Sequence, residues 1–223
     1  NAIRRSFFEL RYGRPRPVHV EIPPEALSEL STYSKYKILS TPTNKINKKS
    51  LEKAVRIISK SKNPVIWAGG GIHLSEASDK LLALAQYLQI PVLTTPEGKG
   101  SISDKHYLSI GSLKGRSTGN SKDPLRDFFY TCDVIIAVGT RFATASPKPH
   151  QQVIQIDIDN NEIGRNHKKT LGLLGDANKV LMNLLSAIKV KTKSKISKKK
   201  KFNKMRYERY DNPKNQIEPL SSY

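Results

Sequence analysis

Three consecutive glycines, Gly69, Gly70 and Gly71, are the residues of this chain best placed to contact a phosphate. They follow an apolar run at residues 65–68 and precede a helical pattern, and at a turn of this kind backbone N–H groups can approach an anion. A nicotinamide fingerprint would need another glycine at the position of Leu74. The glycines therefore leave two interpretations open, a nucleotide-binding turn or a plain tight turn.

Two nearby aspartates, Asp157 and Asp159, form a second group that could do chemistry. Side chains alternate along a strand, so both carboxylates should lie on one face of the strand predicted at residues 153–159. Such a pair can hold a metal ion or perform acid-base catalysis. A carboxylate at the end of a strand more often accepts hydrogen bonds from a ribose or from loop amides, and we favour that interpretation.

The sequence lacks the common catalytic and metal-binding motifs. Its five histidines are scattered, with no pair at zinc-ligand spacing, and its single cysteine, Cys132, lies in an apolar run that indicates a buried side chain. It has neither a Gly-x-Ser-x-Gly elbow nor a phosphate-loop Gly-Lys-Ser/Thr. From the residues alone we expect a ligand-binding domain with no catalytic residue and no metal ligand of its own.

Strands and helices alternate along the chain, and this order predicts a doubly wound parallel sheet of the α/β class. The central strands are short, continuous apolar runs, which are typical of strands buried on both faces. No element is predicted in the glycine-rich segment 98–119. The predicted strands are residues 18–22, 65–68, 91–94, 134–138 and 153–159. The predicted helices are residues 2–12, 124–130 and 177–188, with others beginning near Asn47, Ser75 and Glu162.

The net charge of +20 is concentrated in the C-terminal part of the chain but is not confined to it. Residues 185–223 hold 12 Lys and Arg against 3 Asp and Glu. A basic tail can bind single-stranded nucleic acid, but we favour a solvated linker. No apolar stretch approaches the roughly 18 residues of a membrane span, and no signal-peptide pattern opens the chain. We therefore expect no membrane contact and a location in the cytoplasm or an organelle stroma.

The order of these motifs resembles one family, the thiamine-diphosphate-dependent enzymes of the acetolactate synthase and 2-oxo acid decarboxylase group. The resemblance extends over most of residues 13–188, with the stretches in the family's order and at its spacing. The matching stretches are residues 13–23, 63–71, 90–95 with 98–100, 132–142, 155–164 and 175–177. It implies a Rossmann-like central domain with fragments of its neighbours on either side.

In this family a chain consists of a pyrimidine-binding domain, a central domain and a diphosphate-binding domain. The resemblance implies the end of the first at residues 1–23, a linker at 24–45, the central domain at 46–188, a basic linker at 189–216 and the start of the third at 217–223. The glutamate that activates the cofactor and the Gly-Asp-Gly motif that holds Mg²⁺ would lie outside this chain. The chain is therefore expected to contain no catalytic residue and to be inactive alone.

The central domain of acetolactate synthase-like members binds FAD in a structural role. The residues that the resemblance matches to FAD contacts are Gly69, Gly70, Gly71, Thr95, Gly111, Gly139, Arg141, Asp157, Ile158 and Asp176. The planar guanidinium of Arg141 could neutralise a diphosphate. Residues 143–145 depart from the pattern usual in acetolactate synthases, which leaves open whether FAD, ADP or nothing is bound.

For the parent protein the resemblance implies attack of the thiamine diphosphate ylid on a 2-oxo acid, loss of CO₂ and transfer of the remaining fragment to an acceptor. It also implies Mg²⁺ outside this chain and a homodimer or homotetramer, because the family's active site forms between subunits. Two alternatives stay open. One is a decarboxylase relative with an empty or ADP-binding central domain, and the other is a non-catalytic nucleotide-binding module.

Overall fold

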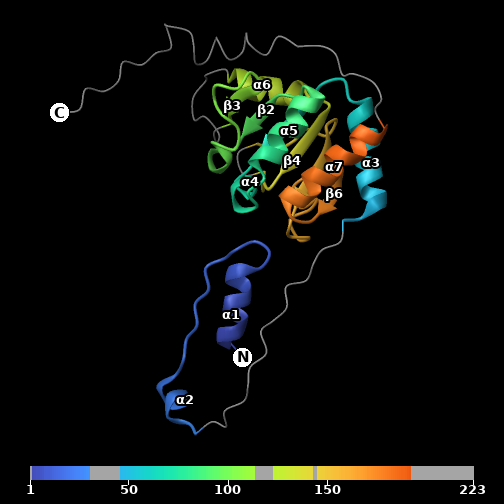
Figure 1. Ribbon diagram of the computed structural model, residues 1–223. Helices are drawn as coiled ribbons and strands as arrows, with labels where there is room; N and C mark the ends of the chain where they lie inside the picture. Colours follow the sequence, from blue (N-terminus) through green and yellow to red (C-terminus); the bar gives the residue numbers. More distant parts are fainter. Residues whose placement is uncertain (1, 31–45, 114–122, 143–144, 192–223) are drawn as a thin grey trace, which may run out of the picture. The chain divides into compact units, whose positions relative to one another are not determined.

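The computed structural model describes residues 2–30, 46–113, 123–142 and 145–191 (Figure 1). Contacts within the chain divide it into two compact units, Asn1–Lys45 and Ile46–Tyr223. The first unit holds helix α1 (Ala2–Arg11), as predicted, and the short helix α2 (Pro24–Ser28). The strand predicted at residues 18–22 is wrong, because no described strand pairs with this segment to take its backbone hydrogen bonds.

The second unit contains, within the described residues, one sheet of six parallel strands in the order β3-β2-β1-β4-β5-β6 (Figure 1). The chain first extends the sheet from β1 toward β3 and then returns to add β4 on the other side of β1. This reversal confirms the predicted doubly wound α/β class. The strands are β1 (Pro64–Ala68), β2 (Val92–Thr94), β3 (Ser109–Ser112), β4 (Val134–Val138), β5 (Gln152–Asp157) and β6 (Thr170–Leu174).

The central strands form where the sequence is apolar on both faces. β1 and β4 pair in register from Pro64 opposite Val134 to Ala68 opposite Val138, and every residue of β4 is buried. A parallel strand covered on both sides needs such a continuous apolar run, which is why these strands could be predicted. The edge strands β3 and β6 were not predicted, because each contains a glycine and a polar first residue that interrupt the apolar pattern.

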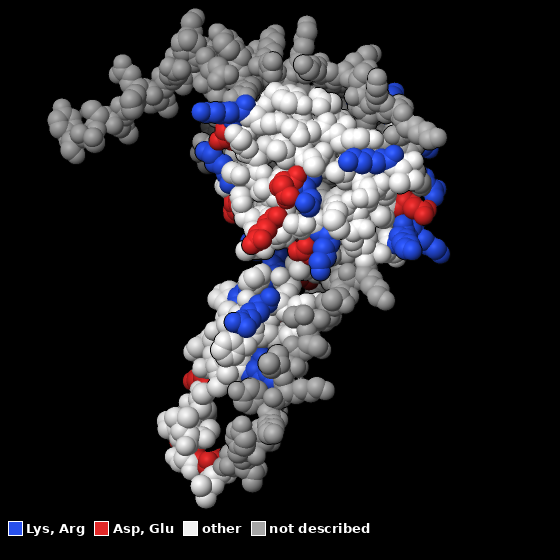
Figure 2. All heavy atoms as spheres, viewed as in Figure 1, with Lys and Arg blue, Asp and Glu red and all other residues white. Residues whose placement is uncertain are grey.

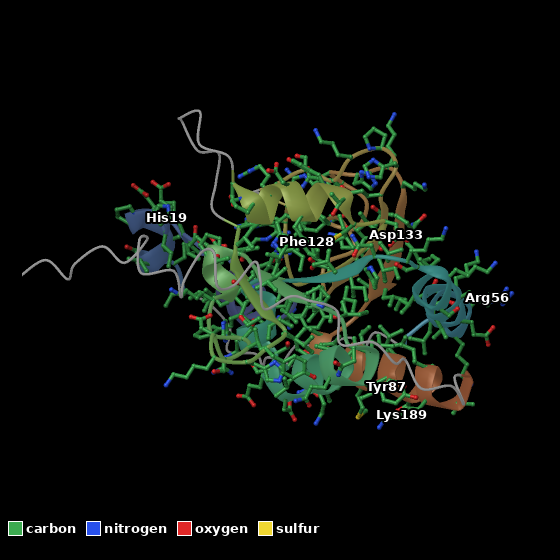
Figure 3. The ribbon with its side chains drawn as sticks, turned by 90° about the horizontal axis from the view of Figure 1, so that it is seen from above. His19, Arg56, Tyr87, Phe128, Asp133 and Lys189 are labelled. Carbon is green, nitrogen blue, oxygen red and sulfur yellow. The ribbon has the colours of Figure 1, made fainter. Side chains whose placement is uncertain are left out.

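Helices cover both faces of the sheet. On one face α3 (Lys48–Lys60), α5 (Ser78–Leu88) and α7 (Ala177–Lys191) pack side by side, and α6 (Pro124–Thr131) lies on the other (Figure 3). The Lys189 ammonium lies 5.5 Å from the centre of the Tyr87 ring and links α7 to α5.

Two boundaries on this face differ from the prediction. Ser75 does not begin a helix, because its hydroxyl donates to the Gly71 carbonyl (2.8 Å) and ends the short helix α4 (Gly71–Leu74). Helix α7 continues to Lys191, three residues into the linker predicted at 189–216. The rest of that linker, residues 217–223 and most of the linker predicted at 24–45 lie outside the described residues.

Asp133, the residue before β4, holds the loop that connects α3 to β1. Its carboxylate accepts hydrogen bonds from the Ser61 hydroxyl and from the N–H groups of Lys62 (2.6 Å) and Asn63 (3.0 Å). Burial raises the pKa of the Asp133 carboxyl, but these hydrogen bonds, led by the one from Ser61, outweigh burial and lower the pKa below its ordinary value. The lowered pKa means that folding favours the ionised carboxylate.

Replacement of Asp133 by asparagine should lower the free energy of unfolding by about 1–2 kcal/mol, because the amide cannot accept all three hydrogen bonds and the charge is lost. Urea denaturation of the 223-residue chain measures this, with the exposed Asp104→Asn as the matched control. An equal loss in both variants would contradict the role given to Asp133.

The lowered pKa of Asp133 also predicts that the stability of the folded chain depends on pH. The stabilisation by Asp133 should be fully present above the unfolded pKa of about 3.9 and should be lost as the pH falls through the lower folded pKa. The difference in unfolding midpoint between the wild type and Asp133→Asn should therefore shrink below about pH 4. If the difference between the two midpoints grew on acidification, the pKa of Asp133 would be raised by folding and not lowered.

Candidate functional site

All of the residues predicted to contact a nucleotide lie in the last two residues of a strand or in the loop that follows it. Since the strands are parallel, these positions share the carboxyl edge of the sheet, and ligands of doubly wound folds bind outside this edge where the strand order reverses. The reversal here lies between β1 and β4. In chain order the positions are Gly69, Gly70 and Gly71 after β1, Thr95 after β2, Gly111 in β3, Gly139 and Arg141 after β4, Asp157 and Ile158 at the end of β5, and Asp176 after β6.

The loops after β1 and β4 touch backbone to backbone at this reversal. A Cβ atom on Gly69 would lie 2.3 Å from the Gly139 oxygen, and one on Gly71 would lie 2.7 Å from the Gly139 Cα. Gly139 itself has a left-handed φ of 58°, which glycine adopts without strain. On the other side, a Cβ on Gly98 would lie 2.2 Å from the Ala68 oxygen. We call Gly69, Gly71, Gly98 and Gly139 the glycine junction.

The N–H groups of the junction already have partners within the chain. Gly69 donates to the Val138 carbonyl (2.8 Å), Gly71 to the Gly139 carbonyl (3.2 Å) and Gly139 to the Ile156 carbonyl (2.9 Å). These N–H groups are therefore directed at carbonyls of β4, of β5 and of the loop after β4. Gly69 and Gly71 thus lie in a tight turn, and their contact with a nucleotide stays a prediction.

Three other predicted positions have a defined local role. The Thr95 hydroxyl accepts the Gly98 N–H (3.1 Å) and begins the 3-10 helix η1 (Pro96–Gly98). Gly111 has a φ of 118° at the point where the pairing of β2 and β3 shifts register. The Asp176 carboxylate accepts the Lys179 N–H (3.2 Å) in the first turn of α7. Contact of these residues with a nucleotide stays a prediction.

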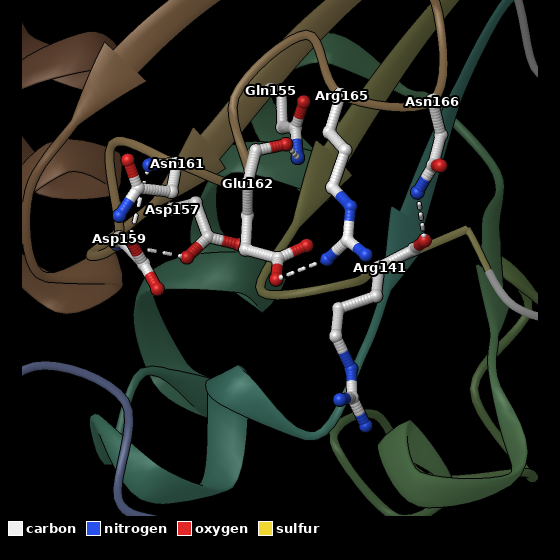
Figure 4. A network of polar contacts seen from close by, with 8 residues as sticks. All are labelled: Arg141, Gln155, Asp157, Asp159, Asn161, Glu162, Arg165 and Asn166. Carbon is white, nitrogen blue, oxygen red and sulfur yellow. Dashed lines mark hydrogen bonds and ion pairs between the residues drawn. The ribbon is translucent and has the colours of Figure 1, made fainter.

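Asp157, the last residue of β5, and Asp159 in the following loop use their carboxylates to shape that loop (Figure 4). Asp157 accepts the N–H of Asp159, and Asp159 accepts the N–H of Asn161, each at 3.0 Å. We favoured two roles for these carboxylates, and one of them, accepting hydrogen bonds from loop amides, is confirmed. Within the described part of the chain, no group of three or more histidine, cysteine, aspartate or glutamate side chains is placed to hold a metal ion.

The short helix predicted at Glu162 is wrong, because residues 160–164 form hydrogen-bonded turns. The buried Gln155 side chain holds these turns, since its amide donates to the Glu162 carbonyl and accepts the Gly164 N–H, each at 3.0 Å. Gly164 then takes a left-handed φ of 74°, which ends any helical path. The Asp-Asn-Asn run before Glu162 is typical of turns, and it could have been used to predict this loop.

This loop brings to the edge a carboxylate that the sequence reasoning missed. The Glu162 side chain is 8% exposed; one oxygen accepts a hydrogen bond from Arg165 (3.0 Å), and the other, Oε2, is buried without a hydrogen-bond partner. Arg141 lies on the neighbouring loop, and its guanidinium is exposed and points away from Glu162 (Figure 4). The edge thus offers a buried acceptor and an exposed planar cation.

Charge is mixed elsewhere on the surface. On the face seen in Figure 2, lysine and arginine side chains alternate with aspartate and glutamate, and pairs such as Lys80–Asp79 (2.7 Å) join opposite charges. No helix among the described residues is both long and apolar enough to cross a membrane.

A doubly wound sheet, a reversal of strand order and polar side chains at the carboxyl edge define this unit as an α/β domain of the class that commonly binds ligands at this edge. Residues 51–184 match the family described as "Thiamine pyrophosphate enzyme, central domain". The chain therefore belongs to the family of thiamine pyrophosphate (thiamine diphosphate) enzymes, as the motifs predicted.

Known relatives agree with this membership. The chain is 35% identical over 198 residues to a probable acetolactate synthase large subunit of Methanocaldococcus jannaschii, covering 82% of this chain and 33% of that protein. It is 30% identical over 229 residues to the acetolactate synthase large subunit of Buchnera aphidicola subsp. Schizaphis graminum, covering 94% and 39%. The chain thus spans roughly a third of the length of these relatives.

A solved structure shares the fold. Benzoylformate decarboxylase from Polynucleobacter necessarius superposes with a TM-score of 0.59 at 19% identity, covering 76% of this chain and 32% of that one. At this identity the similarity concerns the fold alone.

The glycine junction predicts that alanine substitutions in this segment lower the stability of the fold by different amounts. Gly69→Ala should lower the free energy of unfolding of the ligand-free chain by about 1–3 kcal/mol, because its Cβ has no room against backbone that cannot move independently. Gly70→Ala is the matched control, since its Cβ would lie 3.2 Å from the Glu97 Cβ and needs only a small shift. Urea denaturation that gives Gly69→Ala the wild-type midpoint would contradict the backbone contact.

Proposed function

We propose that this chain serves as the central, FAD-binding domain of a thiamine diphosphate enzyme of the acetolactate synthase type. The observation that supports this most is the extent of similarity to acetolactate synthase large subunits, 35% and 30% identity over 82% and 94% of the chain. The parent enzyme would act on a 2-oxo acid, release CO₂ and join the remaining fragment to an acceptor.

The carboxyl edge carries groups that suit a dinucleotide. The exposed Arg141 guanidinium can form two parallel hydrogen bonds with a diphosphate. The buried Glu162 Oε2 offers an unused acceptor to a ligand donor on the next loop. Helix α4, which has four residues, is too short to supply a helix dipole. In this proposal the side chains, rather than the glycine N–H groups, bind the ligand.

The reaction itself belongs to the rest of the parent protein. Thiamine diphosphate, when bound, supplies the carbanion chemistry that decarboxylation requires. It would be held with Mg²⁺ outside this chain, and we propose that this chain alone is inactive. Its contribution would be to bind FAD and to position the flanking domains. Assembly as a homodimer or homotetramer, and a location in the cytoplasm or an organelle stroma, stay predictions.

One observation favours the alternative of a decarboxylase relative with an empty or ADP-binding central domain. The N–H groups of Gly69 and Gly71 are bonded to neighbouring loops, so they add nothing to phosphate binding. Without these donors, the edge offers a dinucleotide fewer hydrogen bonds than a site in which glycine N–H groups bind the phosphates.

Thermal unfolding with added nucleotide separates these functions. A ligand at 100 times its dissociation constant stabilises the folded state by about 2.7 kcal/mol. For a chain of this size that raises Tm by roughly 5–10 °C. We expect this shift with FAD, a smaller one with ADP and none with NAD. Equal shifts with FAD and ADP would favour an ADP site, and no shift with any nucleotide would contradict the FAD proposal.

A further inference from the structure

The Glu162 carboxylate is a buried charge with only half of its hydrogen-bonding capacity in use. Its Oε1 faces Arg165 (3.0 Å), whose side chain is 63% exposed, whereas Oε2 is buried and has no partner. A buried, unpaired acceptor normally costs free energy, so native structures rarely keep one without a purpose. The fold nevertheless fixes this side chain in place.

The support for Glu162 comes from several hydrogen bonds. Its carbonyl accepts the Gln155 amide (3.0 Å), and its N–H donates to the Asp159 carbonyl (3.1 Å). Gln155 is 1% exposed, so the loop is held from within the core. Such support under a functional side chain limits its movement and preorganises it for a ligand.

The other carboxylates of this loop already accept hydrogen bonds within it. Asp157 and Asp159 accept N–H groups of the loop itself at 3.0 Å. Within the described residues there is also no cluster that could hold a metal ion beside them. A ligand N–H or O–H would supply the hydrogen bond that Glu162 Oε2 lacks.

The neighbouring loop indicates what that ligand is. The Asn166 amide donates to the Arg141 carbonyl (2.8 Å) and so ties the loop after β4 to the one that carries Glu162 (Figure 4). Arg141 and Glu162 thus lie on neighbouring loops of one edge, and a nucleotide carries both a diphosphate for a guanidinium and sugar hydroxyls for a carboxylate. A carboxylate is the acceptor that adjacent sugar hydroxyls commonly use in sheets of this class.

We propose that Glu162 Oε2 accepts a hydrogen bond from a sugar hydroxyl of the bound nucleotide, while Arg165 holds the other oxygen in place. Glu162 is then a binding residue beyond those predicted from the sequence. This inference rests on the proposed nucleotide-binding function. The hydroxyl can belong to the ribose of the adenosine part or to the ribityl chain of a flavin.

Calorimetric titration of the 223-residue chain with FAD and with ADP tests this inference. Glu162→Gln keeps the shape of the side chain but removes its charge, and it should weaken binding about tenfold to a hundredfold, as expected for loss of a charged hydrogen bond. Lys168→Met is the control; it removes an exposed cation from the same loop and should change the affinity less than about threefold. Loss with both ligands would identify the ribose, and loss with FAD alone would identify the ribityl chain.

Three outcomes would overturn the inference. The first is unchanged affinity in Glu162→Gln while the wild type binds, which would leave the proposed function intact. The second is an equal loss in Glu162→Gln and Lys168→Met, which would make the loss an effect of surface charge and not of Glu162. The third is a wild type that binds neither ligand, which would remove the proposed function as well. The Tm of ligand-free Glu162→Gln should stay at or above the wild-type value, since a half-paired buried charge is lost.

Discussion

The contact between the loops after β1 and β4 is the constraint on which the carboxyl edge depends. These strands are neighbours because the sheet reverses its order there, and their following loops must pass each other without side chains. Gly69, Gly71 and Gly139 allow this approach, and the N–H groups of Gly69 and Gly71 stabilise it. Every residue farther along those loops, Arg141 included, takes its position from this contact.

The contact also directs where recognition can occur. Because the junction N–H groups are bonded within the domain, the proposed site relies on side chains beyond the junction, among them the Arg141 guanidinium and the Glu162 carboxylate. Side chains can differ between relatives without disturbing the junction. One scaffold could therefore serve central domains that bind different nucleotides or none.

The sequence predicted those parts of the fold in which local pattern and packing agree. The central strands and the family were predicted correctly, because a continuous apolar run that ends in glycine is typical of a buried parallel strand. The edge strands β3 and β6, the turn at Glu162 and the end of α4 at Ser75 were missed. The edge strands and the turn at Glu162 depend on hydrogen bonds from distant residues, and the end of α4 depends on the Ser75 hydroxyl; periodicity detects neither.

Amide hydrogen exchange at the glycine junction, measured without and with FAD, tests the role of this contact most directly. We expect the N–H groups of Gly69, Gly71 and Gly139 to be protected in the free chain and to change little when FAD binds, because their partners are carbonyls of the sheet. Rapid exchange in the free chain, followed by strong protection only with FAD, would contradict this role and restore the glycines as the phosphate-binding turn.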